Sequence, residues 1–345
     1  MGWHPALLVA VVTGYVVLSR PPGRRLSDLD VYLGAVEGLR HGESLYDFIL
    51  GNAPFTYPPF AGLVMVPLTG VPKTGLQVLW TLATVASVVA MARLAGRGDA
   101  PAVALVLFLS APVSSDLRYG QVSLFLALMV LGDVLRPPGR AQGVLIGLAA
   151  AIKLTPLIFI PMLWMRGRRR AAVVATVTFV ACGALAAVAL PGDSWRYWTT
   201  EVRDVDRLGF IDSAGNQSLN GALIRLGLPS AGREVIVLLI GGAVALIALH
   251  RARKLEPLAA TVVVGAASVV LSPVSWTHHQ VWLVLAAICA GSPIGLAVMI
   301  LPVWGDTRLL WAIVVAAVRS SGSSPRSANL EPVDSSTADK WGSQT

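Results

Sequence analysis

The sequence has few charged residues and few cysteines, and both shortages exclude classes of protein. Only 13% of the 345 residues are Asp, Glu, Lys or Arg, and 55% are apolar, whereas soluble domains carry about 25% charged residues. The two cysteines, Cys182 and Cys289, each lie within an apolar run, which favours packing roles over a disulfide framework. With a mean hydropathy of +0.68, the composition predicts a polytopic integral membrane protein.

The chain also lacks the short motifs that bind nucleotides or metals. It contains no Walker loop, no dinucleotide fingerprint, and no CxxC or HExxH motif, so we expect no cofactor and no metal site. An inverted repeat of the transporter kind is not evident either. The net charge of +8 does not indicate a nucleic-acid partner, because basic residues of membrane proteins collect in cytoplasmic loops.

Basic clusters separate the apolar runs and predict an orientation. The four clusters are Arg93/Arg97, Arg136/Arg140, Arg166 with Arg168–Arg170, and Arg251/Arg253/Lys254. The positive-inside rule places them, with both termini, in the cytoplasm of a multi-pass plasma-membrane protein. The loops 20–73 and 191–232 carry nearly balanced charge and are therefore predicted to lie outside.

This orientation predicts an all-α fold with about 12 membrane helices. Ten single crossings are expected near residues 5–19, 74–93, 101–115, 119–135, 170–190, 234–250, 257–272, 278–291, 293–304 and 306–318. Segment 142–165 is flanked by basic clusters on both sides, so we interpret it as two half-helices that meet at Lys153-Leu154-Thr155-Pro156, because proline breaks helices. One crossing by this segment is the alternative, and it would place Arg166–Arg170 outside.

The remaining segments complete one transmembrane domain, residues 1–318. The proline-containing run 57–71 is expected to be a surface or re-entrant helix, and the first run lacks the basic start and cleavage site of a signal peptide. Residues 319–345, rich in Ser, Gly, Pro and Asp, are expected to form a disordered cytoplasmic tail.

The first outer loop carries two carboxylates in Ser27-Asp28-Leu29-Asp30-Val31-Tyr32. Apolar residues recur after it at helical spacing, which predicts an amphipathic surface helix. Ser27 and Asp30 match a capping box, so Asp30 has a structural task at the third helical position. Asp28 is therefore the preferred catalytic carboxylate and Asp30 the second choice, the alternative being that both only cap an interfacial helix.

Other polar residues gather on the same predicted face, in 116–121, 216–220 and 272–279, with Lys153 at the helix break. A cation within the membrane is costly and usually faces a partner, for which a phosphate is the natural choice, unless it snorkels to the interface. His278 and His279 point about 100° apart on a helix, which favours hydrogen bonds to phosphate or sugar over a shared metal. For Trp276 an interface anchor is favoured over sugar stacking, and Arg118 either contacts a phosphate or is solvated.

Taken in order, these stretches resemble glycosyltransferase family 87 of the membrane-embedded glycosyltransferase-C superfamily. The matching stretches are Asp28-Leu29-Asp30-Val31-Tyr32, Gly42–Tyr46 with Phe55–Pro59, Gly120-Gln121, Gly147–Pro156, Asn216-Gln217-Ser218 and Ser272–His279. The resemblance spans residues 28 to about 282, and the ordered set is specific although no single motif is. It implies a glycosyltransferase-C-like fold in which Asp28, matching an Asp-Leu-x-Val-Tyr pattern, is the catalytic base.

The resemblance further implies an inverting transfer of mannose from polyprenyl-phosphate-mannose to a glycolipid or lipoglycan on the outer face, giving an α-mannoside, expected to be α-1,2. The residues expected to bind the donor phosphate or the substrates are Lys153, His278, His279, Arg118, Gln121, Asn216, Gln217, Trp276 and Tyr57. One carboxylate suffices for such a displacement, so no metal is required. The competing interpretation is a multi-pass lipid or sugar transporter or flippase, and the oligomeric state is left open.

Overall fold

A computed structural model describes residues 2–318 except 22, 97 and 303, so Arg97 and the predicted tail 319–345 lie outside the described residues. Helices dominate the described chain, as predicted. The strands that it contains are the two-residue pair β1 (Ile49–Leu50) and β2 (Ala53–Pro54), which are antiparallel.

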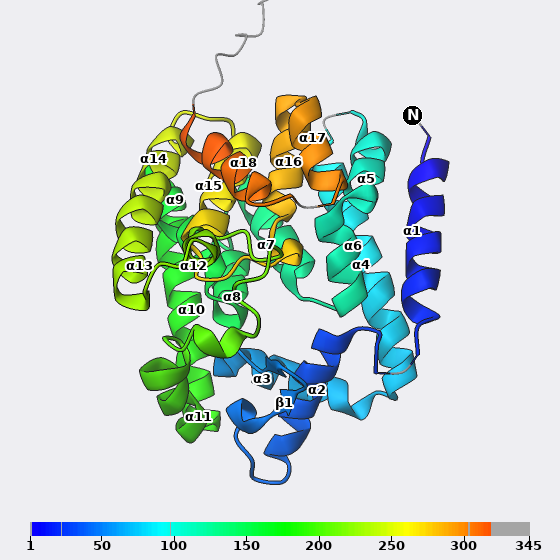
Figure 1. The fold of residues 1–345 in the computed structure, drawn as a ribbon, viewed down its shortest axis with the longest axis vertical. Coiled ribbons are helices and arrows are strands. Elements are labelled where there is room, and N and C mark those ends of the chain that lie inside the picture. The colour runs from blue at the N-terminus through cyan, green and yellow to red at the C-terminus, as the bar shows by residue number, and fades with distance from the viewer. Residues whose placement is uncertain (1, 22, 97, 303, 319–345) are drawn as a thin grey trace, which may run out of the picture.

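Most helices stand side by side in a bundle (Figure 1). These bundle helices are α1 (His4–Leu18), α4 (Lys73–Ala95), α5 (Ala100–Leu109), α6 (Ala111–Tyr119), α7 (Ser123–Leu135), α8 (Val144–Ile152), α9 (Phe159–Met165), α10 (Arg169–Ala189), α13 (Ser230–Ile236), α14 (Gly242–Ala252), α15 (Pro257–Leu271), α16 (Val281–Ala290), α17 (Pro293–Ile300) and α18 (Thr307–Ala317). The short α12 (Leu219–Arg225) lies in the loop before α13.

A cap covers one end of the bundle (Figure 1, bottom). It contains α2 (Ser27–Leu39), α3 (Pro59–Met65), α11 (Pro191–Arg196) and the two strands. Short turns of 3₁₀ or π type extend or connect the helices: η1 (Leu45–Asp47), η2 (Val66–Gly70), η3 (Thr155–Ile158), η4 (Tyr197–Glu201), η5 (Asp206–Leu208), η6 (Val237–Gly241) and η7 (Thr277–His279). Both predicted outer loops thus contribute to the cap.

Three helices in the described part of the chain are long and apolar enough to cross a membrane: α4, α10 and the continuous Ser230–Ala252. The pair α5 and α6 would be a fourth, although it bends by 66° at Ser110. The bend follows from Pro112, which cannot donate a hydrogen bond to the preceding helical turn. The other apolar helices are shorter, and the twelve predicted crossings are not confirmed.

Three of the four basic clusters meet at the end of the bundle opposite the cap. The Arg168 guanidinium donates to the carbonyl of Val134 at 2.7 Å, which joins the start of α10 to the end of α7. The Arg166 guanidinium donates to the carbonyl of Leu255 at 2.7 Å, after α14. The start of α1 and the end of α18 lie at this same end (Figure 1). These three clusters and both described chain ends therefore lie on one side of the bundle.

The predicted helix break at Lys153 is present. Helix α8 ends at Ile152, and Lys153 has extended backbone angles (φ −150°, ψ 131°) before η3 and α9. Both ends of segment 142–165 lie beside the start of α10. Gly143 (φ +104°) packs so closely on α10 that a Cβ would overlap the Ala171 carbonyl oxygen, and α9 ends at Met165, just before α10 begins at Arg169. The segment thus turns back to the end of the bundle where it began, as two half-helices would, and Lys153 stands at the tip of this helical hairpin.

The outward faces of several bundle helices are apolar. Examples are Leu8 on α1, Val188 on α10 and Leu238 in η6, which are 65%, 82% and 71% exposed. Monomeric soluble proteins rarely expose contiguous apolar surface of this kind. The perimeter is that of a membrane protein.

Candidate functional site

A cavity of about 1030 Å³ lies where the cap meets the bundle. Its walls come from α2, the strand that precedes α3, α6 and its following turn, the break at Lys153, the segment after α11, and the loop between α15 and α16. Eight of the predicted site residues line it: Asp28, Tyr57, Arg118, Gln121, Lys153, Trp276, His278 and His279. Residues from five separate parts of the sequence therefore meet in one space.

Asp28 is held at the cavity by an unusual helix start. The N-cap of α2 is Leu26, a non-glycine residue in the left-handed region (φ 50°), and no side chain caps the helix. The Leu26 amide donates to the carbonyl of Arg118 at 3.1 Å, which ties α2 to the end of α6. A non-glycine residue in this strained backbone conformation persists only where the surrounding structure holds it there. Because α2 begins directly after Leu26, Asp28 lies in its first turn.

The predicted capping box between Ser27 and Asp30 is therefore wrong, although the conclusion that Asp30 has a structural task holds. Ser27 is already inside the helix, and its hydroxyl donates to Asp28 Oδ1 at 3.2 Å instead of capping an amide. Asp30 points elsewhere and forms an ion pair with Lys73 Nζ at 2.9 Å. Asp30 does not line the cavity, which leaves Asp28 as the carboxylate of α2 that does.

A hydrogen-bond network surrounds the Asp28 carboxylate. Gln121 Nε2 donates to Asp28 Oδ2. Gln121 Oε1 accepts from the hydroxyls of Tyr32 (3.0 Å) and Tyr57 (2.9 Å), and these two hydroxyls lie 2.9 Å apart. Tyr32 belongs to the matching stretch 28–32 but is not among the predicted site residues, because its position on the apolar face of α2 indicates only packing.

The environment changes the acidity of Asp28. Burial raises the pKa of its carboxyl above the ordinary value of 3.8, and this effect outweighs the hydrogen bonds from Gln121 and Ser27 and the positive charge of Lys153, which lower it. The carboxyl is thus a better proton acceptor than an exposed aspartate.

Lys153 and two histidines form the opposite part of the site. Lys153 Nζ lies 2.7 Å from His279 Nε2 and 5.2 Å from the centre of the Tyr57 ring. The rings of His278 and His279 are 4.5 Å apart and nearly perpendicular. Both ring nitrogens of the buried His278 lack a hydrogen-bond partner within the described chain. Buried polar groups are normally paired, so His278 has unused capacity to bind a ligand.

Arg118 and Trp276 also line the cavity. Arg118 is exposed, and its guanidinium lies 5.2 Å from the centre of the Tyr119 ring. Trp276 is half-buried and comes from the loop that carries the histidines. Both side chains have surface available for a bound molecule.

Asp116 is a buried carboxylate that the sequence analysis named only as part of a polar stretch. Its Oδ2 accepts from the Leu124 amide at 3.2 Å, in the first turn of α7, while Oδ1 has no partner in the described residues. The turn between them contains Gly120 (φ 70°), where a Cβ would lie 2.9 Å from Leu26 Cβ. Asp116 and Gly120 together fix the turn that presents Gln121.

Asn216 and Gln217 are fully buried and do not line the cavity. Asn216 Oδ1 accepts from the Ser275 amide at 2.9 Å, which secures the loop that leads to the histidines. Gln217 Oε1 accepts from the amide of Arg308 at 3.0 Å, at the start of α18. Their polar atoms thus hold the backbone behind the site and do not face the cavity. A polar sequence pattern does not distinguish these two roles.

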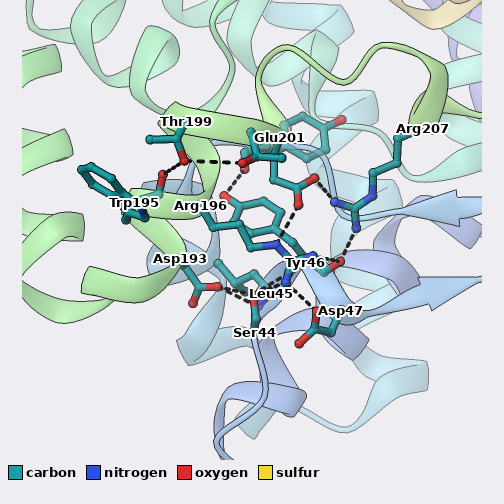
Figure 2. Close-up of polar contacts among 12 residues, drawn as sticks. Ser44, Leu45, Tyr46, Asp47, Asp193, Trp195, Arg196, Thr199, Glu201 and Arg207 are labelled. Atoms are coloured by element: carbon teal, nitrogen blue, oxygen red, sulfur yellow. Dashed lines mark hydrogen bonds and ion pairs between the residues drawn. The ribbon is translucent and has the colours of Figure 1, made fainter.

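A cluster of charged and polar residues, here called the clasp, joins the two predicted outer loops beside the cavity (Figure 2). The clasp consists of Ser44, Tyr46, Asp47, Asp193, Arg196, Glu201 and Arg207. Glu201 accepts from Arg196 Nε at 2.7 Å and also pairs with Arg207, while Arg196 Nη1 reaches Asp47 Oδ1 at 2.5 Å. Glu201 and Arg207 line the cavity, so the clasp forms its outer wall.

Removing the charge at the centre of the clasp is expected to destabilise the protein. Glu201 is only 8% exposed, and in Glu201→Gln both arginines lose their shared carboxylate, which should cost about 1–3 kcal/mol. Thermal unfolding of the detergent-solubilised protein measures this. Glu37→Gln, which removes the exposed Glu37–Arg40 pair, is the matched control and should change stability by less than about 0.5 kcal/mol. Equal melting of both variants would show that the clasp carries no stabilisation.

No group of three or more His, Cys, Asp or Glu side chains gathers as a metal site in the described residues. Asp28, Lys153 and the two histidines lie around the large cavity, whose outer wall also carries Glu201, Asp204 and Arg207.

Comparison with known proteins identifies the family of this chain. The profile of glycosyltransferase family 87 matches residues 55–273, more than half of the chain. The match includes Gln121 and Lys153, whereas Asp28 and the histidines lie outside it. No solved structure matches the chain.

Three curated relatives are similar over most of their length. The polyprenol-phosphate-mannose-dependent alpha-(1-2)-phosphatidylinositol pentamannoside mannosyltransferase of Mycolicibacterium smegmatis is 34% identical over 305 residues, which cover 81% of this chain and 72% of that protein. The protein of the same description from Mycobacterium tuberculosis is also 34% identical, with 76% of this chain and 66% of the relative covered. A phosphatidylinositol mannoside mannosyltransferase of Mycobacterium tuberculosis is 31% identical, with 83% and 75% covered. The chain belongs to glycosyltransferase family 87 and is a membrane glycosyltransferase.

Proposed function

We propose that this glycosyltransferase transfers mannose from polyprenyl-phosphate-mannose to a phosphatidylinositol mannoside on the outer face of the plasma membrane. The new bond is an α-1,2-mannoside formed with inversion. The names of the relatives support the donor, the acceptor class and the linkage.

One observation carries the proposal: Asp28 and Lys153, distant in sequence, line the same cavity. A direct displacement at the anomeric carbon needs a base for the acceptor hydroxyl and a positive charge for the leaving phosphate. Asp28, whose pKa is raised by burial, is the base. Lys153 and the unpartnered nitrogens of His278 meet the phosphate.

The chemical step is a single displacement. The acceptor hydroxyl oxygen forms a bond to the anomeric carbon while Asp28 takes its proton. The bond from the anomeric carbon to the phosphate oxygen breaks, and its electron pair leaves with the lipid phosphate. Attack opposite the leaving group converts a β-linked donor into an α-linked product. A phosphate held by a cation needs no protonation to leave, so one carboxylate suffices where glycosidases use two.

The arrangement of the bundle supports an outer-face reaction. The cap stands opposite the end where three of the basic clusters meet, and the positive-inside rule would place that basic end in the cytoplasm. A polyprenyl chain would lie against the apolar faces of the helices while its phosphate reaches Lys153.

The direct test supplies radiolabelled polyprenyl-phosphate-mannose to membranes of a host that lacks such an enzyme and expresses this chain. We expect label in phosphatidylinositol mannosides, removable by an α-1,2-specific mannosidase, and none when GDP-mannose replaces the lipid donor. Absence of transfer to any lipid extract would contradict the proposal and favour a transporter.

The same assay tests the proposed independence from metals. Because Lys153 supplies the positive charge for a monophosphate, we expect transfer in excess EDTA to equal the untreated rate within about twofold, a change of under 0.5 kcal/mol in activation free energy. A loss of activity that Mg²⁺ or Mn²⁺ restores would show that a cation is part of the site.

A further inference from the structure

We propose that Gln121 is a positioning residue that holds the Asp28 carboxylate through Oδ2 and leaves Oδ1, the more weakly bonded oxygen, to take the proton. The inference rests on the proposed function, in which Asp28 is the base. Gln121 Nε2 donates to Oδ2, so that oxygen is occupied. Oδ1 receives only a 3.2 Å hydrogen bond from the neighbouring Ser27 hydroxyl.

The two tyrosines determine which end of the Gln121 amide faces Asp28. Both phenol hydroxyls lie within 3.0 Å of Oε1 and can donate to it. The opposite orientation would place Oε1 against the carboxylate, two acceptors with no proton between them. The network is thus directional: phenol protons point to the amide oxygen, and the amide protons point to the base.

The surroundings make this network rigid. Gln121 is 5% exposed, and Tyr32 and Tyr57 are 1% and 6% exposed, so water does not compete for their hydrogen bonds. The two phenol rings pack edge to face at 5.2 Å, and the Tyr57 carbonyl accepts from the Tyr46 hydroxyl at 3.0 Å. The network therefore reaches from the base to the clasp.

A purely structural role for Gln121 makes a different prediction. If the amide only joins α2 to the turn after α6, its loss lowers stability without changing the ionisation of Asp28. If it positions the base, its loss removes a hydrogen bond that favours the carboxylate form. The pKa of Asp28 then rises, and activity at low pH is lost earlier.

The test compares Gln121→Leu with Gln77→Leu in transfer assays across pH. Gln77 is 1% exposed on α4 and its side-chain amide makes no hydrogen bond within the described chain, so it is a matched buried glutamine outside the site. We expect Gln121→Leu to lower kcat by about 10–100-fold, as misplacement of a reacting group does, with little change in acceptor KM. The acidic limb of its kcat/KM profile should move to higher pH, while Gln77→Leu should keep the wild-type profile.

Gln121→Glu provides a nearly isosteric second variant in case Gln121→Leu does not fold. It places a second carboxyl beside Asp28, and like charges raise the pKa, so the acidic limb should again move upward. The charged and titratable groups that influence Asp28 are otherwise unchanged: Tyr32 on the same helix, Tyr57, Asp116 on α6 and Lys153.

Two outcomes distinguish the inference from the function on which it rests. If Asp28→Asn is inactive but both Gln121 variants keep the wild-type kcat and pH profile, only the positioning role is overturned. If Asp28→Asn itself transfers mannose normally, the assignment of the base fails and the positioning role fails with it.

Discussion

Replacement of Asp28 by asparagine is expected to lower the rate of mannose transfer by about 10²–10⁴-fold, the usual contribution of a general base. Asparagine keeps the size of the side chain and can still accept from Gln121, but it cannot take a proton from the acceptor hydroxyl. The effect should therefore fall on kcat, with the amount of folded protein and the KM for the donor nearly unchanged. Initial rates at matched expression measure it.

The pH dependence of mannose transfer by the wild-type enzyme gives a second test of Asp28. Asp28 must be ionised to act as a base, and burial raises its pKa above the ordinary 3.8. Activity should therefore fall as pH decreases through this raised pKa, at a higher pH than for an exposed aspartate. In Asp28→Asn this acidic limb should be absent from the residual activity.

Asp30→Asn is the matched control, because Asp30 lies on the same helix two residues further and pairs with Lys73 outside the cavity. Removal of this pair, in which Lys73 is 56% exposed, should leave kcat within about twofold, since pairs with an exposed partner contribute little. Equal activity of wild type and Asp28→Asn, or a greater loss in Asp30→Asn, would remove Asp28 as the base.

Some of this site follows from sequence because the signals are local. Pro156 and the basic residues on both sides of segment 142–165 predict a break at Lys153, and the structure has one. From the sequence, Asp28 was preferred to Asp30 as the catalytic carboxylate because of a capping box that does not form. Asp30 has another structural task, its ion pair with Lys73, and the choice of Asp28 survives because only one of two carboxylates in a turn faces the cavity.

The other features of the site depend on contacts between residues that are distant in sequence, so no local sequence pattern reveals them. The amide of Gln121 meets Asp28 across 93 positions, and the clasp joins residues about 150 positions apart. Polar residues in a loop look alike whether they line the cavity, as His278 does, or support backbone, as Gln217 does. The bend at Ser110 shows a further limit: an apolar run predicts burial or lipid contact, but not whether the run is one helix.

Replacement of Lys153 by methionine is expected to lower kcat by about 10²–10³-fold, as loss of a preorganised charge-stabilising group does. Methionine is similar in length and apolar, so the partly buried position loses its charge without leaving an unpaired ion. The protein should fold, because His279 loses one contact at 2.7 Å while the hairpin of α8 and α9 keeps its packing. Transfer from the lipid donor, measured beside thermal unfolding, separates the two effects.

Lys153→Arg and Lys73→Met complete this experiment. Arginine keeps the charge but presents it as a planar group that does not reproduce an ammonium, so partial activity is expected. Lys73→Met removes an exposed lysine at the start of α4 that does not line the cavity, and it should keep kcat within about twofold. A Lys153→Met enzyme with normal kcat would show that the leaving phosphate is stabilised by other groups, of which the unpartnered nitrogens of His278 would then be the first to test.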